Sequence, residues 1–310
     1  MQHSTILEYR NYRYFKIASL LTFFAVMAYL FDQPATGPYA YGSSWLGYLF
    51  GILSALIAIV QILYGTRKHL SPIRTERRNL SNASSSQQNV PNRRKHEANW
   101  LRHHGATLQG WLSAHIYLGA ALIVLATLHT GFQFGWDVHT LAYALMMIVV
   151  ISGFYGTYAY LRFPRLMTVN MGGRDTFDAL LLEIDDLDKQ AGVKSLQFSD
   201  EICELVLKAR QKTLIGGNFF QQLTAYRRNC PTALAVKQLQ VLGKSLKYDQ
   251  LKPFDDLYSI VAHKEILVKR ARRDVMYRAR MELWLYLHTP FSIAFMAALI
   301  AHIVAIFFYW

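Results

Sequence analysis

The chain has 310 residues, of which 53% are hydrophobic and 14% aromatic, yet 33 are Lys or Arg. This mixture argues against one soluble core and favours apolar spans that alternate with basic loops. The net charge of +13 follows from that topology and gives no reason to expect a nucleic-acid partner. The two cysteines, with no Cys-x-x-Cys-His motif, exclude covalent c-type haem and cannot supply the four ligands of an iron–sulfur cluster.

Five stretches of about 20 mainly apolar residues predict transmembrane helices. They are Tyr14–Phe31, Ser44–Tyr64, Gly110–Phe134, Val138–Leu161 and Leu283–Trp310. The first resembles a signal peptide in its basic flank, but it is long for one and no small-x-small cleavage site follows, so we expect a retained anchor. The predicted fold is an all-α membrane protein, a bundle of five transmembrane helices with a helical cytoplasmic insertion between spans 4 and 5.

These spans divide the chain into five parts. They are an N-terminal two-helix membrane hairpin (1–65), a basic, partly disordered cytoplasmic loop (66–109), spans 3 and 4 (110–163), a cytoplasmic helical domain (164–282) and span 5 (283–310). Within the loop, the polar, low-complexity segment 81–92 predicts disorder, and the basic runs beside it are expected to contact lipid head groups.

All 33 cations fall on one side of the predicted bundle: on the N-terminal flank, in the loop 65–109 and in the segment 162–280. The positive-inside rule makes that side cytoplasmic. The six tryptophans all lie at or near span edges, where indoles prefer to sit. We therefore expect a multi-pass protein of the plasma (bacterial inner) membrane, with its N-terminus inside and its C-terminus outside.

The insertion between spans 4 and 5 is expected to be helical. Apolar residues at helical spacing predict helices over about 175–187, 199–209 and 232–246. A last helix begins near Phe254 and runs directly into span 5. No GxGxxG, P-loop or other nucleotide signature is present, so this part is interpreted as a docking platform rather than a catalytic unit, and nothing in it names its partner.

Two spans carry the same histidine pattern. In each, a histidine follows a tryptophan by four residues and a second histidine follows the first by fourteen, giving His115 and His129 in span 3 and His288 and His302 in span 5. Fourteen residues are nearly four helical turns, so both histidines share a face and stand about 21 Å apart. Spans 3 and 5 run in the same direction, which pairs His115 with His288 and His129 with His302. Two facing imidazoles are what a six-coordinate haem iron requires, so the pattern predicts two haem b groups.

Other roles for the four histidines are weaker. Zinc needs its ligands within about 2 Å of one ion, which a separation of four turns forbids. A proton relay usually recruits carboxylates, and spans 3 and 5 have no Asp or Glu between their histidines. Packing by hydrogen-bonded histidines stays an alternative for any one of them alone. The small residues Gly119, Ala294, Ala298 and Ala301 on the same helices are expected to admit a flat macrocycle.

Three further histidines lie near the predicted span ends. His139 opens span 4 on the outer side and is interpreted as a surface residue, with contact to an outer haem propionate as the alternative. His103 and His104 precede span 3 and are candidates for contact with the propionates of the inner haem.

The arrangement His115/His129 with His288/His302 resembles the ferric reductase and NADPH oxidase membrane core, and is similar to the cytochrome b of quinol–cytochrome c reductases. The resemblance implies electron transfer by a transmembrane bis-histidine dihaem b-type cytochrome, but it does not carry over a donor or an acceptor. No flavin or nicotinamide module is recognised, so we expect an electron-transfer subunit of an oxidoreductase rather than a self-sufficient enzyme. A quinone, membrane lipid and redox subunits on the cytoplasmic or periplasmic side are the candidate partners.

Two other functions stay open at this point. A self-sufficient quinol-linked oxidoreductase would reduce its acceptor at the outer haem. A haem-free membrane adaptor would recruit a partner through its basic helical domain, with the histidines serving only to pack the bundle.

Overall fold

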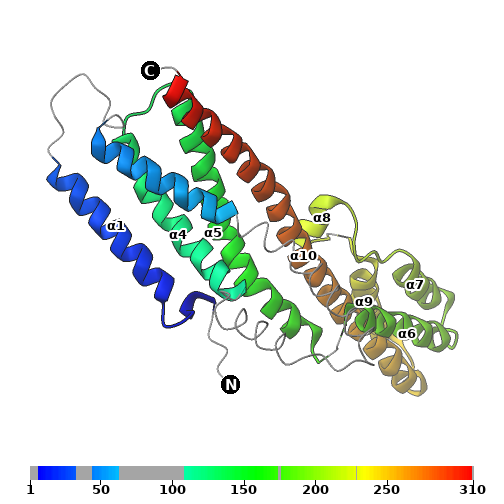
Figure 1. Ribbon diagram of the computed structural model, residues 1–310. Helices are drawn as coiled ribbons and strands as arrows, with labels where there is room; N and C mark the ends of the chain where they lie inside the picture. The colour runs from blue at the N-terminus through cyan, green and yellow to red at the C-terminus, as the bar shows by residue number, and fades with distance from the viewer. Residues whose placement is uncertain (1–5, 33–43, 63–107, 174–175, 228, 309–310) are drawn as a thin grey trace, which may run out of the picture. The chain divides into compact units, whose positions relative to one another are not determined.

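The computed structural model describes residues 6–32, 44–62, 108–173, 176–227 and 229–308 (Figure 1). Within these ranges every regular element is a helix and there is no strand. The predicted disordered segment 81–92, and with it His103 and His104, lies outside the described residues.

Five helices are long and apolar enough to cross a membrane, which agrees with the predicted all-α membrane protein. They are α1 (Arg13–Phe31), the helix Trp45–Ile62, α4 (Leu108–Thr130), α5 (Val138–Met171) and α10 (Tyr248–Phe308). On α1 the large side chains of Leu20, Phe23 and Phe24 are more than half exposed, as expected of a surface that faces lipid rather than water.

Two of these helices are longer than the spans predicted for them. α5 continues ten residues past the expected end at Leu161, through Pro164. α10 begins at Tyr248 and runs for 61 residues, through Pro290, so the prediction of a helix continuous with span 5 is confirmed. Because proline has no backbone N–H, each helix lacks one hydrogen bond at its proline, yet it continues past that residue.

The chain divides into two compact units, one of residues 1–154 and 288–310, the other of residues 155–287. We call them the spanning unit and the inserted unit. The division falls inside α5 and inside α10, which each contribute to both units.

In the spanning unit, the first helix is fixed against α4. The Tyr117 hydroxyl donates to the carbonyl of Leu7 at 3.1 Å, and its ring meets Phe15 edge-on at 5.5 Å. The core of the unit joins the helix Trp45–Ile62 with α4 and α5 through buried residues that include Phe50, Leu125 and Met146. This packing places Gly47 and Gly51, on the helix Trp45–Ile62, against His129 on α4.

The inserted unit packs four short helices against the first half of α10. They are α6 (Phe177–Ser195), α7 (Asp200–Gln211), α8 (Phe219–Thr224) and α9 (Pro231–Leu242). Three of the four were predicted from apolar spacing, whereas α8 was not, since six residues are too few for a periodic pattern. Leu239 and Leu257 lie in one apolar core and Leu180 and Leu267 in a second, all fully buried.

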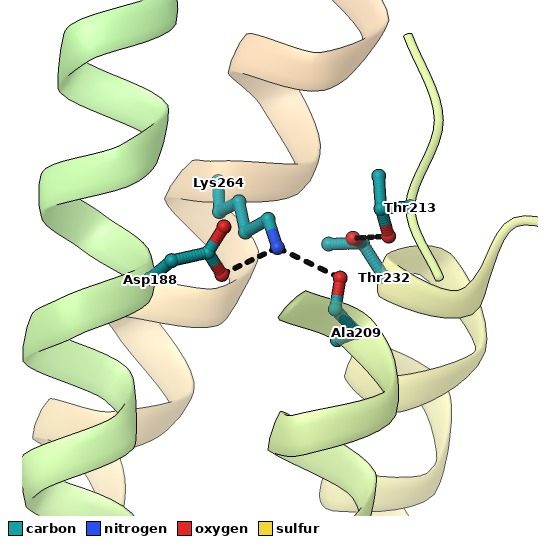
Figure 2. Close-up of polar contacts among 5 residues, drawn as sticks. All are labelled: Asp188, Ala209, Thr213, Thr232 and Lys264. Carbon is teal, nitrogen blue, oxygen red and sulfur yellow. Dashed lines mark hydrogen bonds and ion pairs between the residues drawn. The ribbon is translucent and has the colours of Figure 1, made fainter. Parts of the chain in front are cut away.

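A buried ion pair lies between these cores (Figure 2). The ammonium of Lys264, 2% exposed, donates to Asp188 Oδ1 at 2.5 Å and to the carbonyl of Ala209 at 2.8 Å. Burial raises the pKa of the Asp188 carboxyl and lowers the pKa of the Lys264 ammonium. Because each charge offsets the cost of burying the other, the pair joins α6, α7 and α10 at one point.

Candidate functional site

All four predicted histidines belong to the spanning unit. His115 and His129 lie on α4, and His288 and His302 lie on α10. They are neither fully buried nor exposed within the chain. The fold therefore brings together the two helices that the spacing had matched.

The pair of His129 and His302, called the outer pair after the predicted orientation, is the better defined. The ring centroids of His129 and His302 are 6.0 Å apart and the ring planes are nearly perpendicular, at 86°. Two imidazoles on opposite sides of one metal ion, each bonded at about 2 Å, place their centroids about 6 Å apart. Perpendicular planes are compatible with this, since each ring can rotate about its metal–nitrogen axis.

A hydrogen bond fixes the tautomer of His129. Its Nδ1 atom lies 2.7 Å from the carbonyl oxygen of Gly47, on the helix Trp45–Ile62. A carbonyl can only accept, so Nδ1 must carry the proton and Nε2 keeps its lone pair. Donation from the far ring nitrogen to a backbone carbonyl is the usual support for a metal-binding histidine.

A glycine makes room for the same ring. A Cβ atom at Gly51 would lie 2.8 Å from Cε1 of His129 and 3.0 Å from its Nδ1, closer than side chains tolerate. Gly47 and Gly51 are four residues apart and therefore share one helix face. This face of the helix Trp45–Ile62 receives the His129 imidazole.

The inner pair has a comparable support from α5. The two histidines predicted to form this pair are His115 on α4 and His288 on α10. The Nδ1 atom of His288 is 2.8 Å from the hydroxyl oxygen of Ser152, and that hydroxyl donates to the carbonyl of Val149 at 2.8 Å. Since the hydroxyl proton is used on Val149, His288 Nδ1 donates and its Nε2 keeps the lone pair.

The helix Trp45–Ile62 also contacts α4 beside His115. The amide nitrogen of Gln61 donates to the carbonyl oxygen of His115 at 3.1 Å. This bond fixes the backbone of the histidine rather than its ring.

His139 makes a contact that its position in the sequence did not predict. Its ring stands edge-on to His302, with centroids 4.4 Å apart, and its Nδ1 lies 3.8 Å from Asp137 Oδ1. It was expected at the surface, and its side chain is 49% exposed, so it borders the outer pair rather than joining it inside the bundle.

Asp137 caps α5 at this end. It accepts at Oδ1 from the backbone N–H of Thr140 at 2.8 Å. That hydrogen bond holds the pKa of the Asp137 carboxyl below its usual value. The outer end of the site thus carries a carboxylate beside an exposed imidazole.

The small residues that approach the histidines are not the ones expected from the sequence. A Cβ atom at Gly119 would meet Gln61 Nε2 at 3.5 Å, an ordinary contact. Ala298 is buried, but Ala294 and Ala301 are exposed. Instead, Gly51 closely approaches the His129 ring, while Gly153 lies beside His288, where a Cβ atom would make only an ordinary contact at 3.7 Å.

The histidine repeat lies in spans 3 and 5 and therefore does not predict the supporting residues, which lie in spans 2 and 4: Gly47, Gly51, Ser152 and Gly153. A signal was present for two of them: Gly47 and Gly51 form a small-xxx-small pair inside an apolar span, which marks close approach by another helix. Ser152 had no comparable sign, since a serine in a span commonly bonds its own helix backbone.

The four histidines fit haem iron, because imidazole is a common haem ligand and the predicted pairs supply two ligands for each iron. The centroid distance of the outer pair and the protonated Nδ1 atoms of His129 and His288 agree with this. Within the described residues no group of three or more His, Cys, Asp or Glu side chains is placed to hold one metal ion. No protein-family model, curated protein or solved structure matches the chain. The function is therefore argued from this geometry alone.

Proposed function

We propose that this chain is a dihaem b-type membrane cytochrome that moves electrons across the bilayer. His129 and His302 would hold the iron of the outer haem, and His115 and His288 that of the inner haem. The observation that carries the proposal is the outer pair, in which two imidazoles from different helices stand 6.0 Å apart and one has its tautomer fixed for Nε2 ligation.

The surrounding residues support this role by orienting the ligands. The carbonyl oxygen of Gly47 accepts a hydrogen bond from His129 Nδ1, and the hydroxyl oxygen of Ser152 accepts one from His288 Nδ1. Such bonds hold a ring in place and make its other nitrogen a better ligand. Polar groups inside a membrane are costly, so four histidines at two matched depths need a common purpose.

When bound, two haems would supply reversible one-electron chemistry, and two histidines on each iron would leave no open coordination position for oxygen. The four histidines would hold the two irons, and the apolar core around Leu125 would keep water from the ligands. Burial of this kind also tunes the reduction potential.

The partners and the orientation are part of the same proposal. The cation-free connections face the outside and the inserted unit faces the cytoplasm of a bacterial inner membrane. Electrons would pass between a cytoplasmic subunit or a quinone and a protein on the outer face. Redox modules attached through the inserted unit would make the chain one subunit of a larger oxidoreductase.

The test is a reduced-minus-oxidised visible spectrum of the detergent-purified chain, with haem quantified as the pyridine haemochrome. We expect two b haems per chain. Substituting His115 or His288 by Ala should remove one haem, and substituting His129 or His302 should remove the other. His139→Ala is the matched control, because this imidazole neighbours the outer pair without being a proposed ligand, and it should keep both haems.

A colourless protein from haem-sufficient cells would refute the proposal and leave the membrane adaptor as the better reading. Loss of both haems in the His139→Ala variant would show that haem loss on substitution does not identify the ligands. Reporter fusions at the two chain ends test the orientation separately.

A further inference from the structure

A cavity of about 440 Å³ lies in the inserted unit, between the segment that leads into α9 and the first half of α10. Its volume is within the range of small-molecule sites. Four cationic side chains line it: Arg227, Lys269, Arg272 and Arg273. The acidic side chain in its wall, Glu265, is paired with Lys269 at 2.7 Å, so the cations exceed the anions by three.

Arg272 is the buried member of this group. It is 7% exposed, and its Nε and Nη2 atoms donate to the carbonyl oxygen of Leu214 at 3.2 and 2.9 Å. Arg227 Nη1 donates to the same oxygen at 2.9 Å. A neutral carbonyl shared by two guanidinium groups does not balance either charge, and a buried charge without an opposite charge is costly.

Lys264, a second buried cation of the same unit, has a different kind of partner from Arg272. That buried ammonium has the carboxylate of Asp188 as its partner (Figure 2). Among the described residues, Arg272 has no carboxylate within ion-pair distance. The acid nearest to it in sequence, Asp274, is bonded at 2.8 Å to Arg278. Among the described residues, one buried cation thus has a carboxylate partner, whereas Arg272, in the cavity wall, has only a carbonyl partner.

The start of α9 adds to the positive potential there. Cys230, the N-cap residue, and Ala233, in the first turn, both line the cavity. The cap residue makes no side-chain hydrogen bond to the helix, and Pro231 follows it at the first helical position. The N-terminal end of a helix carries partial positive charge and favours anions.

We propose that this cavity binds a phosphate group, held by Arg272 and Arg273 with Arg227 beside them. Guanidinium groups match phosphate oxygens in pairs, and three excess cations suit the two charges of a phosphate monoester better than the single charge of a carboxylate. The phosphate belongs either to a soluble molecule or to a lipid headgroup. The site is separate from the histidines and does not depend on bound haem.

The test uses the full-length chain in neutral detergent. Equilibrium dialysis with radiolabelled inorganic phosphate, at ionic strength fixed with chloride, measures the dissociation constant and the stoichiometry. Native mass spectrometry of the chain from phosphatidylcholine nanodiscs, with or without phosphatidic acid, counts retained phosphatidic acid. Binding of one phosphate per chain identifies a soluble source, and retention of one phosphatidic acid without phosphate binding identifies a lipid source.

Variants decide whether the cavity is responsible. Arg273→Gln changes an exposed wall residue and Arg272→Gln the buried one, and each should weaken binding about tenfold or more, since a charge-assisted hydrogen bond contributes that much. Lys237→Gln removes the same charge from an exposed position on α9 outside the cavity wall and should change binding less than twofold. Absence of both kinds of binding, or binding that Arg273→Gln leaves unchanged, would overturn the proposal.

Discussion

The Nδ1 atom of His129 and the carbonyl oxygen of Gly47 lie 2.7 Å apart, although the two residues are on different helices and 82 positions apart in sequence. The bond determines which nitrogen of the imidazole is free. The His129–Gly47 contact links the packing of the bundle to the chemistry proposed for it, because any change that displaces the helix Trp45–Ile62 also displaces the ring.

Gly51→Ala should therefore remove the outer haem and keep the inner one. The added methyl group would lie 2.8 Å from the His129 ring, which must move. The haem content of the purified variant, measured as the pyridine haemochrome, should fall from two to one per chain. Gly119→Ala is the control, since its methyl group would make only an ordinary contact at 3.5 Å. Equal haem loss in both variants would contradict the role given to Gly51.

Ser152→Ala should weaken the inner site. The substitution removes the acceptor of the His288 Nδ1 proton, and loss of such a partner typically lowers metal affinity about 10–100-fold. The measurement is haem retention against a haem-scavenging apoprotein. Ser292→Ala is a matched control, because its hydroxyl donates to the His288 carbonyl at 2.7 Å rather than to the ring. Similar loss in both variants would count against ring orientation by Ser152.

The buried pair in the inserted unit predicts a double-mutant result. Lys264→Met leaves the Asp188 carboxylate buried without its partner, which should cost about 3–5 kcal/mol of unfolding free energy. Adding Asp188→Leu should recover most of that loss, since an apolar pair of similar volume packs without unpaired charge. Urea unfolding, monitored by amide exchange in α6 and α7, measures the unfolding free energy of the single and the double variant. A double variant as unstable as the single would show that packing, not charge, is responsible.

Asp137→Ala should loosen the first turn of α5. The carboxylate accepts from the Thr140 N–H, and loss of such a cap costs about 1 kcal/mol. Because this bond lowers the pKa in the folded state, the stabilisation is present above the ordinary value of 3.8 and is lost as the pH falls through the lower folded value. Amide exchange at the start of α5 should thus differ between wild type and variant at pH 7, and the difference should shrink below pH 3.8.

Asp137→Ser provides the control for the cap. Serine also accepts from the N–H two or three positions on, so it should keep protection of the first turn without any change near pH 3.8. A serine variant as unprotected as the alanine variant would mean that the charge, rather than the cap, stabilises this end.

The sequence by itself determined the class of fold and the helices that carry the histidines. Apolar runs of about 20 residues dictate spanning helices, because a bilayer leaves backbone groups no partner outside the helix. A repeat of fourteen residues puts His115 and His129 on one face whatever their neighbours are. The continuity of α10 from the inserted unit into span 5 followed in the same way, from the lack of a breaking sequence.

Only the tertiary structure decided which residues surround the histidines. The contacts of Gly51 with His129, of Ser152 with His288 and of His139 with His302 join segments far apart in sequence. Periodicity gives the face of a helix but not the helix that will meet it. The same holds for Arg272: its charge is visible in the sequence, but its burial in the cavity wall, with no carboxylate partner in the described part of the chain, depends on how α9 and α10 pack.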